Sequence, residues 1–254
     1  MDIQVVSDLH LEEKDDIIDN NCRSDILFLA GDIGHIDDPK YADFVKSCSK
    51  KWRLVISVLG NNEYYSASES MEQLYEKYKA LYERFPNTFL LEKRSIEFER
   101  YKIIGATTWG NFFPGCIGGS PRKIKIFDEK GNLKHIGHER LRDMHAESKE
   151  WILKQIDDSK DNIIVTHFPL TLENEHVRQM QHREEDRKVL DEFGCELQLS
   201  GRNICCISGH THHSHDFIRD GTRYISNQKG YDDENGSTNY NASWCYTIFK
   251  KSSI

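Results

Sequence analysis

Many hydrophobic residues of this chain are grouped into short apolar runs that are bounded by turn residues. Several runs are apolar at consecutive positions, which is typical of strands that are buried on both faces. We therefore expect buried strands near residues 3–7, 26–30, 54–59, 102–106, 162–166, 203–208, 223–226 and 244–249.

Two longer segments repeat their apolar residues at three- and four-residue intervals, which predicts amphipathic helices. The first runs from Met71 to Phe85, behind Ser66 and Glu69, whose spacing has the form of an N-terminal capping box. The second has Leu141, Met144, Ser148, Trp151, Ile152 and Ile156 on one face. Both apolar stripes are expected to pack against the core.

The order of these elements predicts the fold class. Strands alternate with helices in the first part of the chain, and mainly strands follow Cys205. This order favours an α/β fold in which two mixed β-sheets pack as a sandwich with flanking helices, giving four layers, α/β/β/α. The 254 residues, 37% of them hydrophobic, suffice for one sizeable core, so we expect a single domain over residues 1–254.

Residues 111–140 differ from this pattern and are expected to form a hairpin or lid insertion. Two short segments, 123–127 and 133–137, flank a turn-like stretch at 128–132. The cluster of Arg122, Lys123 and Lys125 can either meet an anionic substrate or belong to a solvated surface, and the solvated surface is the favoured interpretation.

Charge and cysteine content narrow the possible functions. A formal net charge of −8 argues against a general nucleic-acid or anionic-membrane binder, although a local basic cleft is compatible with it. We identify no signal peptide and no membrane span, which predicts a cytoplasmic protein. The seven cysteines contain no CxxC pair, so reduced and mostly buried thiols are expected.

Residues that can bind a metal follow the predicted strands closely. Asp8 and His10 come after the first strand, and their separation of two places both side chains on one side of an extended chain. Asp32 follows the second strand, directly after Gly31.

Three later strands end in the same way. Asn61 follows the third predicted strand, His167 follows a later one, and the His210-Thr211-His212 segment follows another. Because sites in open sheets form beyond the carboxyl ends of the strands, we expect these loops to converge.

Taken in order, these segments resemble the calcineurin-like metallophosphoesterases. That family has the pattern Asp-x-His, Gly-Asp, Gly-Asn-His-Asp/Glu, His and Gly-His-x-His, and the resemblance spans Asp8 to His212. "GNNEYY" at 60–65, "TTWGNF" at 107–112, and the spacing of His145, Ser148 and Trp151 are similar to a small bacterial and viral branch of the superfamily.

The resemblance implies two divalent metal ions, with Asp32 bridging them because its two oxygens can each face a cation. Nitrogen and oxygen ligands without thiolate suit manganese first, with iron or zinc as alternatives. The implied ligands of the first ion are Asp8, His10, Asp32 and His212, and those of the second are Asp32, Asn61, His167 and His210.

The charge of such a centre indicates the reaction. Two divalent cations outweigh Asp8, Asp32 and a bridging hydroxide, so the centre stays positive and attracts a phosphate. Paired ions lower the pKa of the shared water and stabilise its in-line attack on phosphorus. The expected function is hydrolysis of a phosphoester substrate, with Asp32 and Asn62 as catalytic residues.

Asn62 departs from the family pattern, which has a histidine there, oriented by the acidic residue that follows. Asparagine can donate a hydrogen bond to phosphate but cannot deliver a proton, and Glu63 is expected to lose its partner. Phosphodiesters with good leaving groups are therefore favoured over monoesters. Alternatively, His213, His35 or His215 supplies the donor, or Asn62 is a deliberate replacement that traps substrate.

Asn62 and His213 are also the candidate substrate-binding residues. Two rival functions remain open. One is a catalytically impaired scaffold that binds partners, against which the complete ligand set argues. The other is a nuclease, which requires the basic hairpin to lie beside the metals. These patterns specify neither the physiological substrate nor the oligomeric state.

Overall fold

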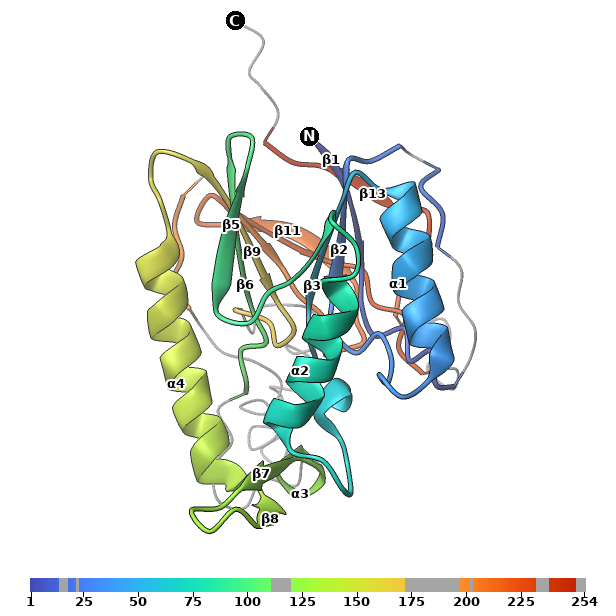
Figure 1. Ribbon diagram of the computed structural model, residues 1–254. Helices are drawn as coiled ribbons and strands as arrows, with labels where there is room; N and C mark the ends of the chain where they lie inside the picture. The colour runs from blue at the N-terminus through green and yellow to red at the C-terminus, as the bar shows by residue number, and fades with distance from the viewer. Residues whose placement is uncertain are drawn as a thin grey trace, which may run out of the picture.

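The computed structural model describes residues 1–13, 18–21, 23–110, 120–171, 197–201, 203–231 and 238–249. Within these ranges the chain forms two mixed β-sheets packed face to face, with helices on both outer faces (Figure 1). The predicted α/β sandwich with four layers is confirmed.

The first sheet contains the strands that the N-terminal apolar runs predict. Its order is β13-β1-β2-β3-β4, and β1 to β4 are parallel while β13 is antiparallel to β1. The strands are β1 (Asp2–Val6), β2 (Ile26–Ala30), β3 (Leu54–Val58), β4 (Thr88–Leu90) and β13 (Cys245–Thr247).

The second sheet has the order β11-β12-β10-β9-β6-β5. Its four central strands are parallel, and β5 and β11 pair antiparallel at the two edges. The strands are β5 (Arg94–Phe98), β6 (Tyr101–Ala106), β9 (Asp161–Thr166), β10 (Ile204–Ile207), β11 (His215–Arg219) and β12 (Thr222–Ser226).

Helices cover the outer face of each sheet. The helices α1 (Pro39–Lys51) and α2 (Met71–Tyr82) pack on the first sheet, and α4 (Gly137–Gln155) packs on the second (Figure 1). Between the sheets lies a fully apolar layer that includes Val5, Ile56, Ile103 and Val165, all 0% exposed. This rigid frame fixes where the strand ends meet.

Two details of the helices differ from the sequence-based expectation. The cap of α2 is Ser70, whose side chain accepts from the backbone N–H of Gln73 while Gln73 returns the bond, so the capping box assigned to Ser66 and Glu69 was wrong. Ser66 instead accepts from Glu69 N at 3.1 Å in the preceding turn. Helix α1 was not predicted.

The predicted hairpin is present. It pairs β7 (Lys125–Phe127) with β8 (Leu133–His135), and the short helix α3 (Ser120–Lys123) precedes it (Figure 1). The rest of the predicted insertion, residues 111–119, lies outside the described residues, and a lid role stays a prediction.

Cysteines follow the expectation in part. Cys48, Cys205 and Cys206 are free and buried, as predicted. Cys245 is disulfide-bonded, so the prediction that all thiols are reduced was wrong. The other three cysteines lie outside the described residues.

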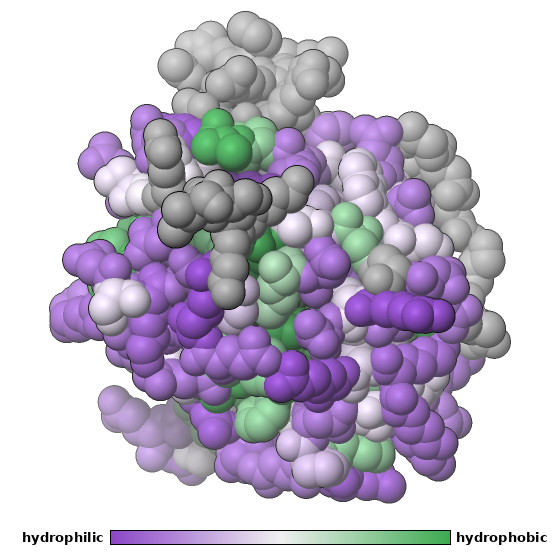
Figure 2. All heavy atoms as spheres, turned by 90° about the horizontal axis from the view of Figure 1, so that it is seen from above, coloured by the Kyte–Doolittle hydropathy of each residue, from purple (hydrophilic) through white to green (hydrophobic). Residues whose placement is uncertain are grey.

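The end of the molecule that carries the N-terminus has a mixed surface. On this face, hydrophilic side chains surround separate apolar ones (Figure 2). No described helix has the length and hydrophobicity that crossing a lipid bilayer requires.

Candidate metal centre

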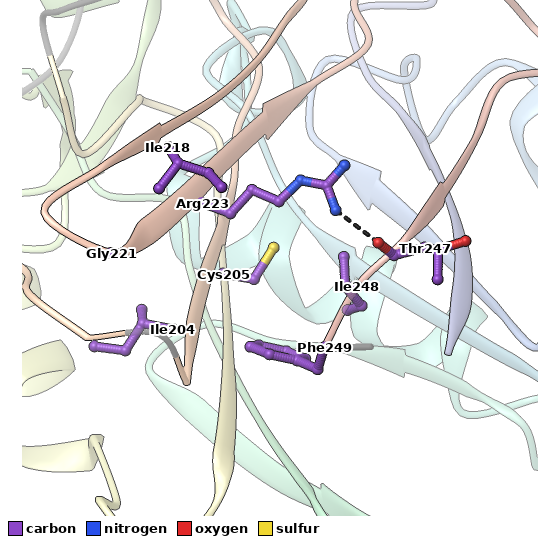
Figure 3. A pocket seen from close by; sticks show the side chains of 8 residues that line it. All are labelled: Ile204, Cys205, Ile218, Gly221, Arg223, Thr247, Ile248 and Phe249. Carbon is purple, nitrogen blue, oxygen red and sulfur yellow. Dashed lines mark hydrogen bonds between the residues drawn. The ribbon is translucent and has the colours of Figure 1, made fainter. Parts of the chain in front are cut away.

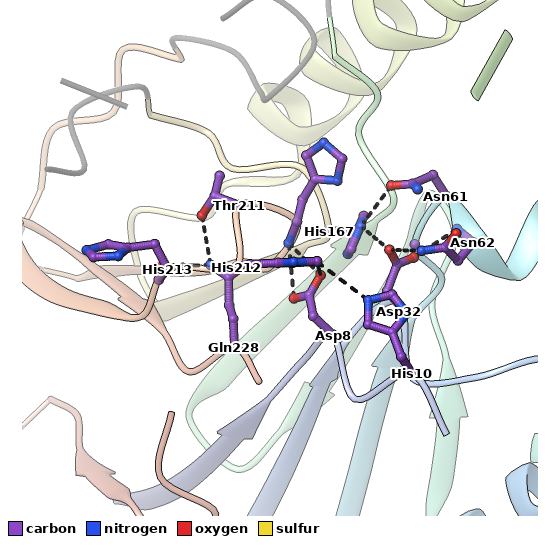
Figure 4. A network of polar contacts seen from close by, with 12 residues as sticks. Asp8, His10, Asp32, Asn61, Asn62, His167, Thr211, His212, His213 and Gln228 are labelled. Carbon is purple, nitrogen blue, oxygen red and sulfur yellow. Dashed lines mark hydrogen bonds and ion pairs between the residues drawn. The ribbon is translucent and has the colours of Figure 1, made fainter. Parts of the chain in front are cut away.

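The candidate metal ligands gather where the parallel strands of both sheets end. Asp8 and His10 follow β1, and Asp32 follows β2. Asn61 and Asn62 follow β3 and open the short 3₁₀ helix η1 (Asn62–Tyr64), while the three remaining histidines follow β9 and β10 (Figure 4). The convergence expected from the strand order is therefore observed.

Most of these side chains sit on left-handed backbone, which non-glycine residues rarely adopt. The φ angles are 54° at Asp8, 48° at His10, 52° at Asp32, 73° at His210 and 50° at His212. Such conformations cost on the order of 1–3 kcal/mol each and persist where the surrounding structure imposes them, often at functional sites. Five of the seven candidate metal ligands therefore lie on such backbone.

One cluster consists of Asp8, His10 and His212, whose potential ligand atoms all lie within 4.8 Å of one another. The Nε2 atoms of His10 and His212 are 3.5 Å apart, and His212 Nε2 lies 3.4 Å from an Asp8 carboxylate oxygen. Asp8 also accepts from the backbone N–H of His210 at 3.1 Å. This contact ties the first cluster to the second.

The second cluster consists of Asp32, His167 and His210 under the same distance limit. His167 Nε2 lies 3.4 Å from Asp32 Oδ2 and 3.1 Å from Asn61 Oδ1 (Figure 4). Asn61 therefore places a neutral amide oxygen, which can bind a metal, beside the carboxylate and the two imidazoles of this cluster.

Hydrogen bonds behind this cluster orient its donors. His167 Nδ1 donates to the carbonyl of Ala30 at 2.8 Å, which leaves Nε2 on the side of the cluster. The amide nitrogen of Asn61 donates to the Tyr65 hydroxyl at 2.9 Å, so its carbonyl oxygen faces His167. Both arrangements direct an atom that can bind a metal toward the same point.

Asn62 contacts Asp32 twice. Its backbone N–H donates to Oδ1 at 2.9 Å and its side-chain amide donates to Oδ2 at 2.7 Å (Figure 4). The Asn62 side chain thus holds the Asp32 carboxylate in place, a contact that the sequence did not predict.

Glu63 has backbone partners in place of the histidine that the family pattern pairs with it. Its two oxygens accept four backbone N–H groups, from Asp32 at 2.9 Å, Ile33 at 2.7 Å, Gly60 at 2.7 Å and Gly34 at 3.4 Å. The side chain is 1% exposed. Glu63 therefore joins the loop after β2 to the loop after β3 and fixes their spacing.

Two pairs of the loops that carry the candidate ligands approach each other too closely for side chains. A Cβ atom on Gly60 would lie 2.1 Å from Asp32 Oδ1, and one on Gly209 would lie 2.7 Å from Asp8 Oδ2. Glycine is required at both positions, because any larger residue would displace a carboxylate.

Burial and mutual charge shape the electrostatics. Burial alone would raise the pKa of Asp8, but the hydrogen bond and charge of His212 hold it below its ordinary value. Burial alone would lower the pKa of His167, but the neighbouring Asp32 raises it to about 9. Burial, with the neighbouring His167, lowers the pKa of His210 to about 3 and keeps that ring neutral. Two buried carboxylates make the centre attractive to cations.

Tyr231 is a site residue that the sequence did not reveal. Its ring stacks on His10 with centroids 4.3 Å apart and meets His212 edge-on at 5.0 Å. Burial raises the pKa of Tyr231 to about 12, and its hydroxyl is hydrogen-bonded to the Asn62 side chain. Tyr231 thus touches the first cluster with its ring and reaches the second through Asn62.

The histidines considered as replacement donors lie outside both ligand clusters. The carbonyl of His213 accepts from Gln228 at 3.0 Å, His35 Nε2 contacts the carbonyl of Tyr65 at 3.1 Å, and His215 lies on β11. A substrate contact by His213 stays a prediction.

The other motif segments meet behind the second cluster. Trp109 is 1% exposed and packs against Tyr64 and Phe168, with ring centroids 5.7 Å and 5.6 Å apart. His145 Nδ1 is hydrogen-bonded to the carbonyl of Trp109. These residues form an aromatic support for the loops rather than part of the centre.

A separate cavity of about 930 Å³ lies at the opposite ends of the strands (Figure 3). Arg223 crosses it and donates to the carbonyl of Thr247 at 2.7 Å. Ile204 and Gly221, at the amino ends of β10 and β12, also line it. The cavity is thus remote from the chemistry at the carboxyl ends.

The donor sets fit transition metal ions. Each cluster combines carboxylate oxygen with imidazole nitrogen and no thiolate, which suits manganese, iron or zinc better than calcium. Hydrogen bonds orient the ligands from behind, as metal sites require. Asp32 lies in the second cluster and is close enough to His10 for their charges to interact.

Comparison with known proteins agrees with this geometry. Residues 1–214 match the family model for calcineurin-like phosphoesterases. An uncharacterised protein of Acanthamoeba polyphaga mimivirus is 27% identical over 93% of this chain and 94% of its own length. The crystal structure of phosphopantetheinyl hydrolase from Mycobacterium tuberculosis superposes with a TM-score of 0.66 at 16% identity, covering 99% of this chain and 97% of that one. This chain belongs to the calcineurin-like phosphoesterase family.

Proposed function

We propose that this protein is a hydrolase of phosphoesters that depends on two divalent transition metal ions, manganese being the first candidate. The two adjoining clusters of buried ligands carry the proposal. The first ion would be held by Asp8, His10, Asp32 and His212, and the second by Asp32, Asn61, His167 and His210.

The surrounding residues would prepare this centre for phosphate. When bound, such ions polarise phosphoryl oxygens and activate water. Asn62 holds the shared Asp32 carboxylate by two hydrogen bonds, and Glu63 holds the loops that carry both residues. The chain thereby contributes preorganised ligands rather than a covalent nucleophile.

We further propose that phosphodiesters are preferred over monoesters. Asn62 stands where the family has a proton-donating histidine, and a carboxamide cannot protonate a leaving oxygen. Its amide is also engaged with Asp32 at 2.7 Å. Esters with leaving groups that need little protonation are therefore the substrates that this centre handles best.

Metal analysis and a substrate panel test the function. Protein purified with manganese should contain close to two ions per chain and hydrolyse bis(p-nitrophenyl) phosphate faster than p-nitrophenyl phosphate. A phosphopantetheinylated carrier protein belongs in the panel, given the name of the structural neighbour from M. tuberculosis. Absence of both bound metal and turnover would favour the scaffold function instead.

Asn62→His tests the diester preference separately. A histidine at this position should raise kcat/KM for monoesters more than for diesters, with general acids contributing about 10²–10⁴ in rate. Asn62→Ala is the matched control, because it also removes the bond to Asp32 without adding a donor. Equal changes for both ester classes would refute a role of position 62 in leaving-group choice.

A further inference from the structure

The base of the hairpin is attached to the loop that carries Asn61 and Asn62. Tyr65 and Ile124 form an isolated antiparallel bridge, and Ser66 N donates to the carbonyl of Lys123 at 3.2 Å. Ile124 is 0% exposed and belongs to the core under α2. Lys123 therefore has a fixed position relative to the candidate centre.

The side chain of Tyr65 lies between the ammonium group of Lys123 and the second cluster. Its Nζ atom is 4.7 Å from the centre of the Tyr65 ring. The hydroxyl of the same ring accepts from Asn61 at 2.9 Å, and Asn61 contacts His167. A cation thus stands at the edge of the site, held over an aromatic face.

Lys123 and its neighbour Arg122 form an exposed basic pair on an acidic chain. Several other surface cations are paired with carboxylates, as Lys93 and Arg140 are with Glu147 at 3.0 Å and 2.8 Å. Across the described ranges, no carboxylate lies within 4 Å of Arg122 or Lys123, although both are exposed. Among the described residues, their positive charge is therefore left available to an anion.

We propose that Lys123, assisted by Arg122, forms a second anion-binding subsite for a phosphate group other than the one under attack. This inference rests on the proposed function. The substrate class that fits is a phosphoester with two phosphates joined by a short linker. A nucleoside 3′,5′-bisphosphate and a nucleic-acid strand both have this chemistry.

The metal-loaded full-length protein provides the test, with thymidine 5′-monophosphate and thymidine 3′,5′-bisphosphate as calorimetric probes. The bisphosphate should bind about tenfold more tightly, since it can reach both sites, and added salt should reduce this preference. Lys123→Met, which keeps the aliphatic stem on Tyr65, should bring the ratio of the two dissociation constants close to one. Lys123→Arg should restore it.

Lys130→Ala, at the exposed tip of the same hairpin, is the matched control and should keep the wild-type ratio. Equal affinities of the wild type for both probes, or a Lys123→Met ratio equal to that of the wild type, would overturn the subsite alone. Failure of both probes to bind would overturn the proposed function with it. A further experiment measures the affinity for oligothymidylate. If oligothymidylate binds more tightly than the bisphosphate, and Lys123→Met removes this difference, the second phosphate belongs to a nucleic-acid strand.

Discussion

Glu63 shows how one buried side chain can organise a site that it does not enter. It accepts N–H groups from two loops that begin about thirty residues apart in the sequence. In the family pattern an acidic residue here is read as the partner of a histidine. In this protein its role is to keep the loop that carries Asp32 against the loop that carries Asn61.

Glu63→Gln tests this role. An amide nitrogen in place of Oε2 would face the N–H groups of Asp32 and Gly60 and leave both unsatisfied, which costs on the order of 2–5 kcal/mol of unfolding free energy. Urea denaturation measures the loss. Glu69→Gln, which weakens only the exposed pair with Lys77, should cost less than about 1 kcal/mol. Similar losses in both variants would contradict the role.

Tyr231 gives a second prediction at this scale. Tyr231→Phe keeps the ring on His10 but removes the hydroxyl bonded to Asn62, so we expect an unchanged metal content and a KM about tenfold higher for diesters. Tyr231→Ala also removes the stacked ring and should weaken metal binding. A Phe variant with the wild-type KM would show that the hydroxyl does not act on substrate.

At the scale of elements, the parallel strands and the loops after them were the most predictable parts. Strands buried on both faces read as continuous apolar runs, and ligands that follow them must meet at one edge. Helix α1 was missed although its buried residues, Tyr41, Phe44, Val45 and Cys48, recur at three- and four-residue intervals, because this apolar stripe is only four residues long. The edge strand β5 is half-buried and shows no such run.

Contacts made by irregular segments could not be predicted. Tyr231 reaches His10 because Gly230 N donates to the carbonyl of Asp8 at 3.0 Å, a pairing between distant parts of the chain. No periodicity or spacing signals such a contact. The four N–H groups around Glu63 could not be predicted either, because a backbone donor does not depend on the type of its residue.

The strand β11 carries a group that should make stability depend on pH. His215 is largely buried near Phe217, and its Nε2 has no hydrogen-bond partner among the described residues. Burial lowers the pKa of His215 to about 4, with smaller opposing effects of His213 and Asp216. The folded state therefore favours the neutral ring, whereas the unfolded chain protonates it at its ordinary pKa near 6.5.

This difference in pKa between the folded and unfolded states sets the direction of the pH dependence. The contribution of neutral His215 to the free energy of unfolding is fully present above pH 6.5. It is lost as the pH falls toward 4, and the loss is about 2–3 kcal/mol at pH 4.5. His215→Gln should lose that much less unfolding free energy between pH 7.5 and 4.5, as measured by urea denaturation at both values. Parallel losses in the variant and the wild type would rule out His215 as the titrating group.

For the whole molecule, metal binding should add to stability. Ions that bind only the folded state at about 100 times their Kd contribute about 2.7 kcal/mol, which for a chain of this size raises Tm by about 5–10 °C. Differential scanning calorimetry with and without manganese measures the shift. Asp32→Asn should abolish most of it, because Asp32 belongs to both proposed ligand sets. No shift with manganese, iron or zinc would exclude the proposed centre.

The distribution of the ligands between the sheets has a mechanical consequence. Asp8, His10, Asp32 and Asn61 extend from the first sheet, whereas His167, His210 and His212 extend from the second. Each bound cation would therefore cross-link the two halves of the sandwich at one end. Sliding of one half over the other would be restrained most where substrate enters, and amide hydrogen exchange at the ends of β2 and β9 would slow together.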